Sequence, residues 1–191
     1  MFRGMSEEKM NITQEMKDHF LMRTKKHIAL VNKYYSKFYK VLKKEAPILH
    51  HDASKFESPE MIPYIYIAWE YLCKREGKPF SVDEDTRKQM NKATEHHVRN
   101  SKHHPEYWSD RKDDLIPKED RDKFDPTKIA IIDVSTTMPK TAIVEMCADW
   151  CGMSEEKGNT PFEWADTVVD KRWKFGDNTD YLYKVLEMMW E

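Results

Sequence analysis

The chain has 191 residues, of which 35% are charged and 39% hydrophobic, with a net charge of -2 and only 5 glycines. Charges of both signs are interspersed and form no basic stripe, so duplex nucleic acid is not expected as a partner. No apolar run approaches the length of about 18 residues that a membrane-spanning helix needs. The first residues lack the apolar stretch of a secretory signal, so we expect a cytoplasmic protein.

The residue types favour one helical domain. Glycines are few, while Lys, Glu, Met and Leu are frequent, and these residues are good helix formers. We expect an all-α domain over residues 1–191, with residues 1–10 as a loose N-terminal segment. The cysteines Cys73, Cys147 and Cys151 lie in apolar runs and are expected to be reduced core thiols. A thiolate metal site at Cys147 and Cys151 would lack a second cysteine pair.

The first half of the chain reads as a series of helices. Apolar residues at helical spacing predict one bent helix or two over residues 11–46, ended by Pro47. Ser58-Pro59-Glu60 predicts a helix cap with proline at the first helical position, and this helix should end near Gly77. The next helix is more polar. We expect Ser81 or Asp83 to cap it and the helix to run to about Arg99.

Residues 100–137 are the least regular part of the chain, because prolines interrupt a dense run of charges. This region is either a solvated loop or a lid over a polar substrate. Residues 128–134 have the composition of a strand, although one strand alone makes no sheet. Three helices are expected after this region. Their predicted bounds are Thr136 or Thr137 to about Gly152, Thr160 to about Phe175, and Asn178 or Thr179 to the C-terminus.

Histidines and aspartates follow one another in an order that fits a metal site. His51-Asp52 stands in the stretch HHDASK, His27 precedes it, and Asp149 follows in an apolar helical run. Neutral imidazole and carboxylate suit Zn, Mn, Fe, Co or Ni, and a mixed set with open positions suits catalysis. An acid in an apolar run, as at Asp149, is costly unless it is paired or bound to a metal. Because Pro47 breaks the preceding helix, we expect His51-Asp52 at a helix start.

A second group of histidines lies in the stretch HHVRNSKHHPEYW, residues 96–108. We favour His97 and His104 as metal ligands, with His97 at the end of one helix and His104 at the opening of the next. His103 is then assigned to substrate contact, and His96 to a supporting or solvent-facing role. The alternative pairing of the four histidines stays open.

Lys55 and Glu145 are candidate catalytic residues. Lys55 follows Asp52 closely and is expected to contact a phosphate, the alternative being a surface lysine. Glu145 lies one helical turn before Asp149 and on the same face. It is expected to orient a ligating histidine or to act as a base, the alternative being an exposed glutamate. His50 is expected to face away from the site.

The pattern resembles the HD-domain superfamily of metal-dependent phosphohydrolases. The resemblance is carried by His27, by His51-Asp52 with Lys55, and by Asp149. It implies a helical bundle in which His27, His51, Asp52 and Asp149 hold one metal. Some members hold a second metal through two further histidines, with the HD aspartate as the bridge, and residues 96–104 would supply these histidines here.

The motifs HHxxxxxHHxEYW and EMxxDW also resemble a family of short uncharacterised proteins found largely in phages and bacteria. This likeness covers residues 20–155 and implies the HD fold without a known activity. The chain departs from two-metal HD members in one respect, since only seven residues separate His97 from His104. It also lacks an HD-GYP-like glycine signature, so a cyclic-dinucleotide activity is not indicated.

The resemblance implies a phosphohydrolase with one or two divalent ions of Mn, Fe, Co, Ni or Zn. The expected partner is a small phosphorylated molecule, a nucleotide or nucleoside phosphate by the habit of the family. Soluble HD enzymes are often oligomers, so self-association is open, and a phage-encoded chain would work in the host cytoplasm. The first alternative is a di-iron oxygenase of the HD type. The second is a non-catalytic binding protein with a vestigial metal site.

Overall fold

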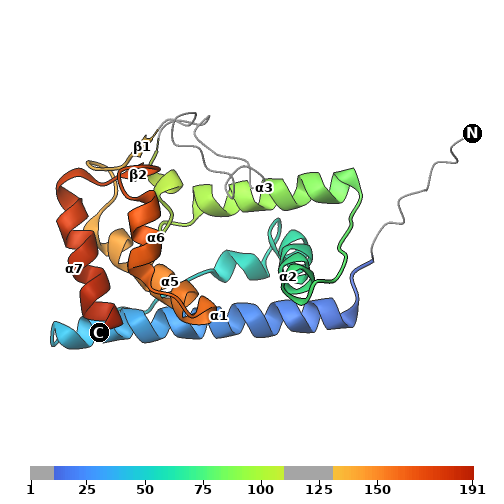
Figure 1. Ribbon diagram of the computed structural model, residues 1–191, viewed down its shortest axis with the longest axis horizontal. Coiled ribbons are helices and arrows are strands. Elements are labelled where there is room, and N and C mark those ends of the chain that lie inside the picture. The colour runs from blue at the N-terminus through green and yellow to red at the C-terminus, as the bar shows by residue number, and fades with distance from the viewer. Residues whose placement is uncertain (1–10, 110–130) are drawn as a thin grey trace, which may run out of the picture. The chain divides into compact units, whose positions relative to one another are not determined.

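The computed structural model describes residues 11–109 and 131–191. The expected loose segment 1–10 and most of the expected irregular region lie outside the described residues. The described part is all-α, as the composition predicted, apart from a sheet of two short strands (Figure 1). Among the described helices, none is long and apolar enough to cross a membrane.

The described residues group into two compact units, and each unit draws on two separate stretches of the chain. The first unit contains the described residues of Met1–Thr24 together with Ala53–His97. The second contains Lys25–Asp52 and the described residues of Val98–Glu191. The expectation of one domain over residues 1–191 stays a prediction.

The first helix, α1 (Gln14–Val41), is a single continuous helix of 28 residues that contributes to both units. It begins three residues after the predicted Asn11, because Thr13 is the residue that caps it. The Thr13 Oγ1 atom accepts a hydrogen bond from the backbone N–H of Met16 at 3.2 Å. The helix also ends before the predicted residue 46, with Lys43 in a left-handed conformation at φ 55°.

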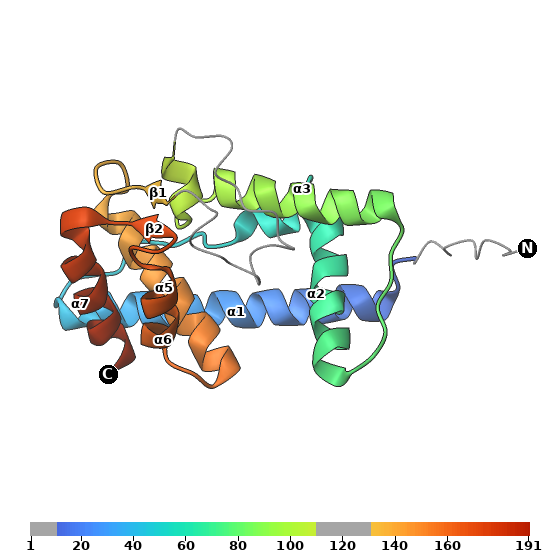
Figure 2. The same cartoon turned by 45° about the horizontal axis from the view of Figure 1, so that its top comes forward.

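The first unit is built around a small apolar core between helices. The short 3₁₀ segment η1 (Ala53–Phe56) precedes α2 (Met61–Glu76), and α3 (Glu84–Asn100) follows. Within this unit α2 lies between the N-terminal part of α1 and α3 (Figure 2). The buried side chains that form the core come from these three helices and are Met16, Phe20, Ile65, Tyr66, Ile67, Ala68 and Met90.

Two of the predicted helix boundaries in this unit are confirmed and one is wrong. Gly77 ends α2 in the left-handed conformation, with φ 67°, as the sequence indicated. Asp83 caps α3, since its Oδ1 atom accepts from the backbone N–H of Thr86 at 2.7 Å. However, Glu60 is the residue that flanks α2, so Pro59 lies before the helix and not at its first position.

The second unit packs the remaining part of α1 with α5 (Lys140–Lys157), α6 (Pro161–Val168) and α7 (Thr179–Trp190). The predicted starts of α6 and α7 are confirmed, with Thr160 and Asn178 as the flanking residues. Pro139, not Thr136 or Thr137, flanks α5. The predicted end of α5 near Gly152 is wrong, because the helix continues through this glycine to Lys157 and Gly158 caps it.

The predicted end of α6 at Phe175 is also wrong. The helix stops at Val168, and β2 (Trp173–Lys174) then pairs in parallel with β1 (Ile132–Asp133). Asp170 turns the chain between the helix and the strand in a left-handed conformation at φ 57°. The strand predicted over residues 128–134 is therefore confirmed at Ile132–Asp133. Its partner strand comes from a segment that the sequence pattern assigned to a helix.

The three cysteines are free thiols in buried positions, as expected for core cysteines. Burial raises the pKa of Cys151 to about 12 and also raises that of Cys147, so both stay protonated at neutral pH. Neutral thiols inside an apolar core contribute packing rather than metal binding.

Candidate metal centre

The residues that the sequence singled out first lie together in the second unit. His27 comes from α1, His51 and Asp52 from the turn before η1, and Asp149 from α5. Their side chains are 10%, 0%, 1% and 16% exposed, respectively. Charged groups at this depth need partners that compensate for the loss of water.

Four atoms of these residues converge on one point. The Nε2 atoms of His27 and His51 are 3.3 Å apart, and Asp149 Oδ1 is 3.1 Å from His27 Nε2 and 3.9 Å from His51 Nε2. Asp52 Oδ2 is 3.7 Å from each of the two nitrogens. Adjacent ligands of one metal at about 2.1 Å lie about 3.0–3.5 Å apart, so only a small contraction would bring all four atoms to a common ion.

The donor set fits a divalent transition metal. Two neutral imidazoles and two carboxylates supply two negative charges, which balance the charge of one ion. The Nδ1 atom of His51 faces a carboxylate oxygen of Glu145 at 3.1 Å, so this nitrogen carries the proton and Nε2 carries the lone pair. His27, His51 and Asp149 form one of the groups whose ligand atoms lie within 4.8 Å of one another.

Asp52 reaches the cluster through an unusual backbone conformation. Its φ of 57° lies in the left-handed region, which non-glycine residues seldom adopt, although aspartate tolerates it better than most. The expected helix start is found one residue later, since η1 begins at Ala53. The left-handed turn allows the neighbours His51 and Asp52 to face the same centre, which successive residues of a helix cannot do. Such strain is often found at functional sites.

Glu145 links two histidines of the cluster. Its Oε1 atom is 3.1 Å from His51 Nδ1 and 3.2 Å from His103 Nδ1. Burial raises the pKa of Glu145, but the hydrogen bonds from His103 and His51 outweigh it and bring the pKa down to about 2. The carboxylate is therefore ionised at neutral pH and fixes the tautomers of both imidazoles, with Nε2 of each turned toward the aspartates.

His103 belongs to the same cluster. It is 4% exposed, and its Nε2 atom lies 3.7 Å from Asp52 Oδ1, the oxygen opposite the one that faces His27 and His51. His51, Asp52 and His103 form a second group with ligand atoms within 4.8 Å. The sequence assigned His103 to substrate contact and left the alternative pairing open; its position beside Asp52 is that of a potential ligand.

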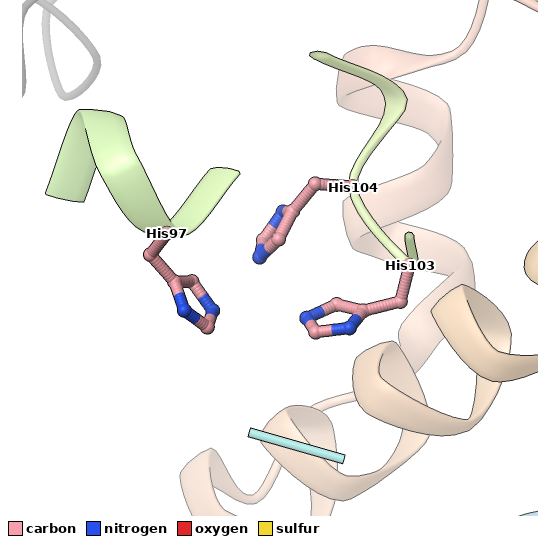
Figure 3. A group of neighbouring side chains, drawn as sticks. All are labelled: His97, His103 and His104. Carbon is pink, nitrogen blue, oxygen red and sulfur yellow. The ribbon is translucent and has the colours of Figure 1, made fainter. Parts of the chain in front are cut away.

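The two histidines favoured from the sequence occupy the predicted places on the backbone. His97 lies in α3, and His104 flanks the 3₁₀ segment η2 (Pro105–Trp108). Figure 3 shows His104 beside His103 on the segment after α3, and their ring centres are 4.3 Å apart. The roles of His97 and His104 as ligands stay predictions.

Glu60 is a buried acid that the sequence pattern indicated only as part of a helix cap. Within the first unit it is 0% exposed, and its oxygens lie 2.8 Å from His96 Nδ1 and 2.9 Å from His97 Nδ1. Ser54 Oγ donates a third hydrogen bond at 2.9 Å. Burial raises the pKa of Glu60, and the contacts with His97, His96 and Ser54 lower it below its usual value. No local signal predicts this role, because the histidines lie 36 and 37 residues away.

Lys55 and His50 have different surroundings. Lys55 is half-buried in η1, with its Nζ atom 5.1 Å from the ring centre of Tyr64, and its expected contact with a phosphate stays a prediction. His50 is exposed, although it is the neighbour of His51. Two adjacent histidines thus differ completely in burial, which makes His50 a natural control for His51.

The face of α5 that carries Asp149 continues toward the C-terminal end of the helix. Glu145, Asp149 and Glu156 recur at positions that share one face, and Glu156 Oε2 is 3.8 Å from His27 Nδ1. That nitrogen is buried and has no hydrogen-bond partner within residues 11–109 and 131–191. Glu156 is thus a carboxylate beside His27 on the side away from the centre, a position that no sequence pattern indicated.

Gly152 lies on the same face and allows α5 to approach α1 closely. A Cβ atom at this position would lie 3.3 Å from Val31 Cγ2 and 3.4 Å from Leu30 Cβ. Val31 is one turn from His27 on α1, and Gly152 is one turn from Asp149 on α5. The missing side chain therefore lets the two helices bring His27 and Asp149 into contact.

Comparison with known proteins places the whole site in one family. Residues 16–189 match the family model described as "Family of unknown function (DUF5662)". The chain belongs to this family. Every candidate ligand lies within the matched range, so the site is part of the DUF5662 region and not an addition to it. No curated protein and no solved structure matches the chain.

Proposed function

We propose that this DUF5662 member is a metal-dependent phosphohydrolase whose metal is held by His27, His51, Asp52 and Asp149. The observation that carries the proposal is the approach of the His27 and His51 Nε2 atoms to 3.3 Å, with Asp149 Oδ1 3.1 Å from the former. The resemblance to HD-domain phosphohydrolases supports it, because the same four residues carry that resemblance.

When bound, a divalent transition metal would lower the pKa of a coordinated water to about 7 and would polarise a phosphoryl oxygen. The residues of the chain would orient the ligand side chains and shield the centre from bulk water. Glu145 holds the ring of His51 through Nδ1, which keeps Nε2 available as a ligand atom. A carboxyl group with a pKa of about 2 is a weak base at neutral pH, so Glu145 fits an orienting role better than proton abstraction.

The proposed substrate is a small phosphate ester, a nucleotide or a nucleoside phosphate. Hydrolysis transfers the phosphoryl group to water and releases the alcohol, with no oxidant or second substrate. In this proposal Lys55 binds the non-bridging phosphate oxygens as a cation on a flexible stem. The nucleotide preference comes from the HD resemblance, and the phosphate ester from the chemistry that such a centre supports.

A di-iron oxygenase is a second candidate function, and one observation favours it. Asp52 presents Oδ2 to His27 and His51 and Oδ1 to His103, with separations of 3.7 Å in each case. A carboxylate with ligands on both sides has the form of a bridge between two metal ions. Two irons held in this way would allow oxygen chemistry, but a two-metal hydrolase would use the same bridge, so the oxygen requirement of turnover separates the two candidates.

Metal reconstitution separates the two candidates. Metal-free protein is loaded with Mn²⁺, Co²⁺, Ni²⁺ or Fe²⁺ and given nucleoside monophosphates without oxygen, and released phosphate is measured. The proposal expects phosphate release that Asp149→Asn abolishes and that His50→Ala leaves unchanged. Two irons per chain with turnover that requires oxygen would favour the oxygenase, and normal biological effect in a folded Asp149→Asn variant would favour a binding protein.

A further inference from the structure

A buried ion pair in the second unit anchors the turn that carries His103. Arg172 Nη2 donates to Glu106 Oε1 at 2.9 Å, and the two side chains are 10% and 3% exposed. Glu106 belongs to η2, three residues after His103. A buried pair of this kind is weak evidence for stability, because the loss of hydration offsets much of the attraction. Its placement beside the cluster therefore calls for another explanation.

Arg172 is itself held in place by the backbone. Its carbonyl oxygen accepts from the N–H of Ile132 at 3.0 Å, and its N–H donates to the carbonyl of Val168 at 2.8 Å. The guanidinium lies over the ring of Trp173, with 4.4 Å from Cζ to the ring centre. The backbone of Arg172 is thus held by β1 and the end of α6, and the guanidinium is held by Trp173 and Glu106.

The same strand is tied to the helix that carries Asp149. Trp173 stacks on Trp150 of α5 with a centroid distance of 6.0 Å and an interplanar angle of 21°. Trp150 directly follows Asp149 in the chain. A continuous series of contacts therefore runs from Asp149 through Trp150, Trp173 and Arg172 to Glu106.

The turn between His103 and Glu106 is held by its own hydrogen bonds. The backbone N–H of His104 donates to the carbonyl of Ser101 at 3.0 Å, and that of Tyr107 donates to the carbonyl of His104 at 3.1 Å. Trp108 Nε1 also donates to the carbonyl of Lys102 at 2.9 Å. An anchor at Glu106 consequently fixes the backbone position from which His103 reaches Asp52.

We infer that Arg172 is a positioning residue that acts through Glu106 to hold His103 against Asp52 in the metal centre. The inference rests on the proposed function, since it concerns a ligand position of the same centre. It assigns the ion pair the task of fixing the distance between the His103 turn and α5. In this assignment Arg172 acts on His103 through Glu106.

A double-mutant cycle with Co²⁺ as the probe tests the inference. Metal-free full-length protein is titrated with Co²⁺, and binding is followed by the visible absorption of the Co²⁺ complex. Arg172→Met and His103→Ala should each weaken binding by about tenfold or more, as the loss of a supporting contact or a ligand does. The double variant should bind no more weakly than His103→Ala alone. Arg172→Lys keeps the charge and should recover part of the affinity.

A matched control comes from the first unit. Arg87 pairs with Glu70 at 2.9 and 3.0 Å and lies 5.7 Å from the ring centre of Phe80, so it repeats the contacts of Arg172 at a more exposed position. Arg87→Met should leave Co²⁺ binding unchanged. Additive losses in the cycle, or wild-type binding by a folded Arg172→Met variant, would overturn the inference. If Arg172→Met does not fold, Glu106→Gln removes the partner charge instead, and wild-type Co²⁺ binding by this variant would overturn the inference equally.

A second readout needs no metal. His103 is buried, so it should resist a histidine-acylating reagent in the wild-type protein and react faster in Arg172→Met, while His27 keeps its rate. Equal rates at His103 in both proteins would contradict the inference. If wild type and His51→Ala both fail to bind Co²⁺, the proposed function fails, and the acylation rates still decide the role of Arg172.

Discussion

His27 Nε2 and His51 Nε2 lie 3.3 Å apart, although 24 residues separate the two histidines in the chain. Asp149 Oδ1 and Asp52 Oδ2 lie 3.1 and 3.7 Å from His27 Nε2, so two imidazole nitrogens and two carboxylate oxygens face one point. A shared cation accounts for all four groups, because each offers a lone pair and the carboxylates supply the balancing charge. This relationship is the core of the proposed metal centre.

Removal of one imidazole should therefore abolish tight metal binding. His51→Ala is expected to weaken Co²⁺ binding by at least a hundredfold, since it removes a ligand that is 0% exposed and replaces it with a cavity. Isothermal titration of metal-free protein measures the effect. His50→Ala, which changes the exposed neighbour, should bind as the wild type does. Equal losses in both variants would show that the effect does not come from ligation.

The proposed metal site also depends on how closely α1 and α5 approach. Gly152→Ala should lower stability, although alanine favours helix by about 1 kcal/mol over glycine. The new Cβ atom would meet Val31 and Leu30 at 3.3 and 3.4 Å, and such overpacking costs about 1–3 kcal/mol. We expect a net loss of about 1 kcal/mol in urea unfolding and weaker Co²⁺ binding.

The exposed Thr141 on the same helix offers a control for Gly152. Thr141→Ala adds helix propensity at an exposed position, so the stability of this variant should stay equal or rise slightly. A Gly152→Ala protein that is more stable than wild type and binds Co²⁺ equally well would contradict the close packing of α1 and α5 at this position.

Glu145 is expected to act through the histidines that it holds. Glu145→Gln keeps the shape but removes the charge that fixes His51 and His103 through their Nδ1 atoms. Such outer-shell changes lower metal affinity by about 10–100-fold. Competition with a chelator at pH 7 measures the change, and Glu187→Gln, at an exposed position on α7, is the control. Unchanged affinity in Glu145→Gln would assign the carboxylate to another task.

Glu60 should contribute to the stability of the first unit. Glu60→Gln removes the ionised acceptor of three hydrogen bonds in a position that is 0% exposed. We expect a loss of about 2–3 kcal/mol in the free energy of unfolding, within the range for a broken buried charge network. Glu57→Gln, at an exposed position three residues earlier, should change stability by less than about 0.5 kcal/mol. Equal stabilities of the two variants would contradict this assignment.

The sequence predicted the helices and indicated the four residues of the proposed centre because both leave local signals. Helical periodicity and capping residues such as Asp83 and Thr160 act over a few positions, and polar residues inside apolar runs stand out. Asp149 is an example, since an acid in a buried helix needs a partner. The order of His27, His51-Asp52 and Asp149 then indicated one site.

The residues that support the centre could not be predicted in the same way. Glu60 and Arg172 find their partners 36 and 66 residues away, and no periodic pattern encodes a contact over that distance. Gly152 misled the prediction of α5, because a glycine inside a helix usually indicates its end. Here close packing against α1 outweighs the cost of glycine in a helix. The left-handed turn at Asp52 likewise depends on tertiary contacts that the dipeptide does not reveal.

An X-ray structure of the metal-loaded chain, with anomalous data at the edges of the bound metal, tests the central claim most directly. The proposal predicts an anomalous peak about 2.0–2.2 Å from His27 Nε2, His51 Nε2 and one oxygen each of Asp52 and Asp149. A second peak between Asp52 Oδ1 and His103 Nε2 would favour the two-metal candidate. A metal-loaded crystal with no peak among these four residues would contradict the proposed centre.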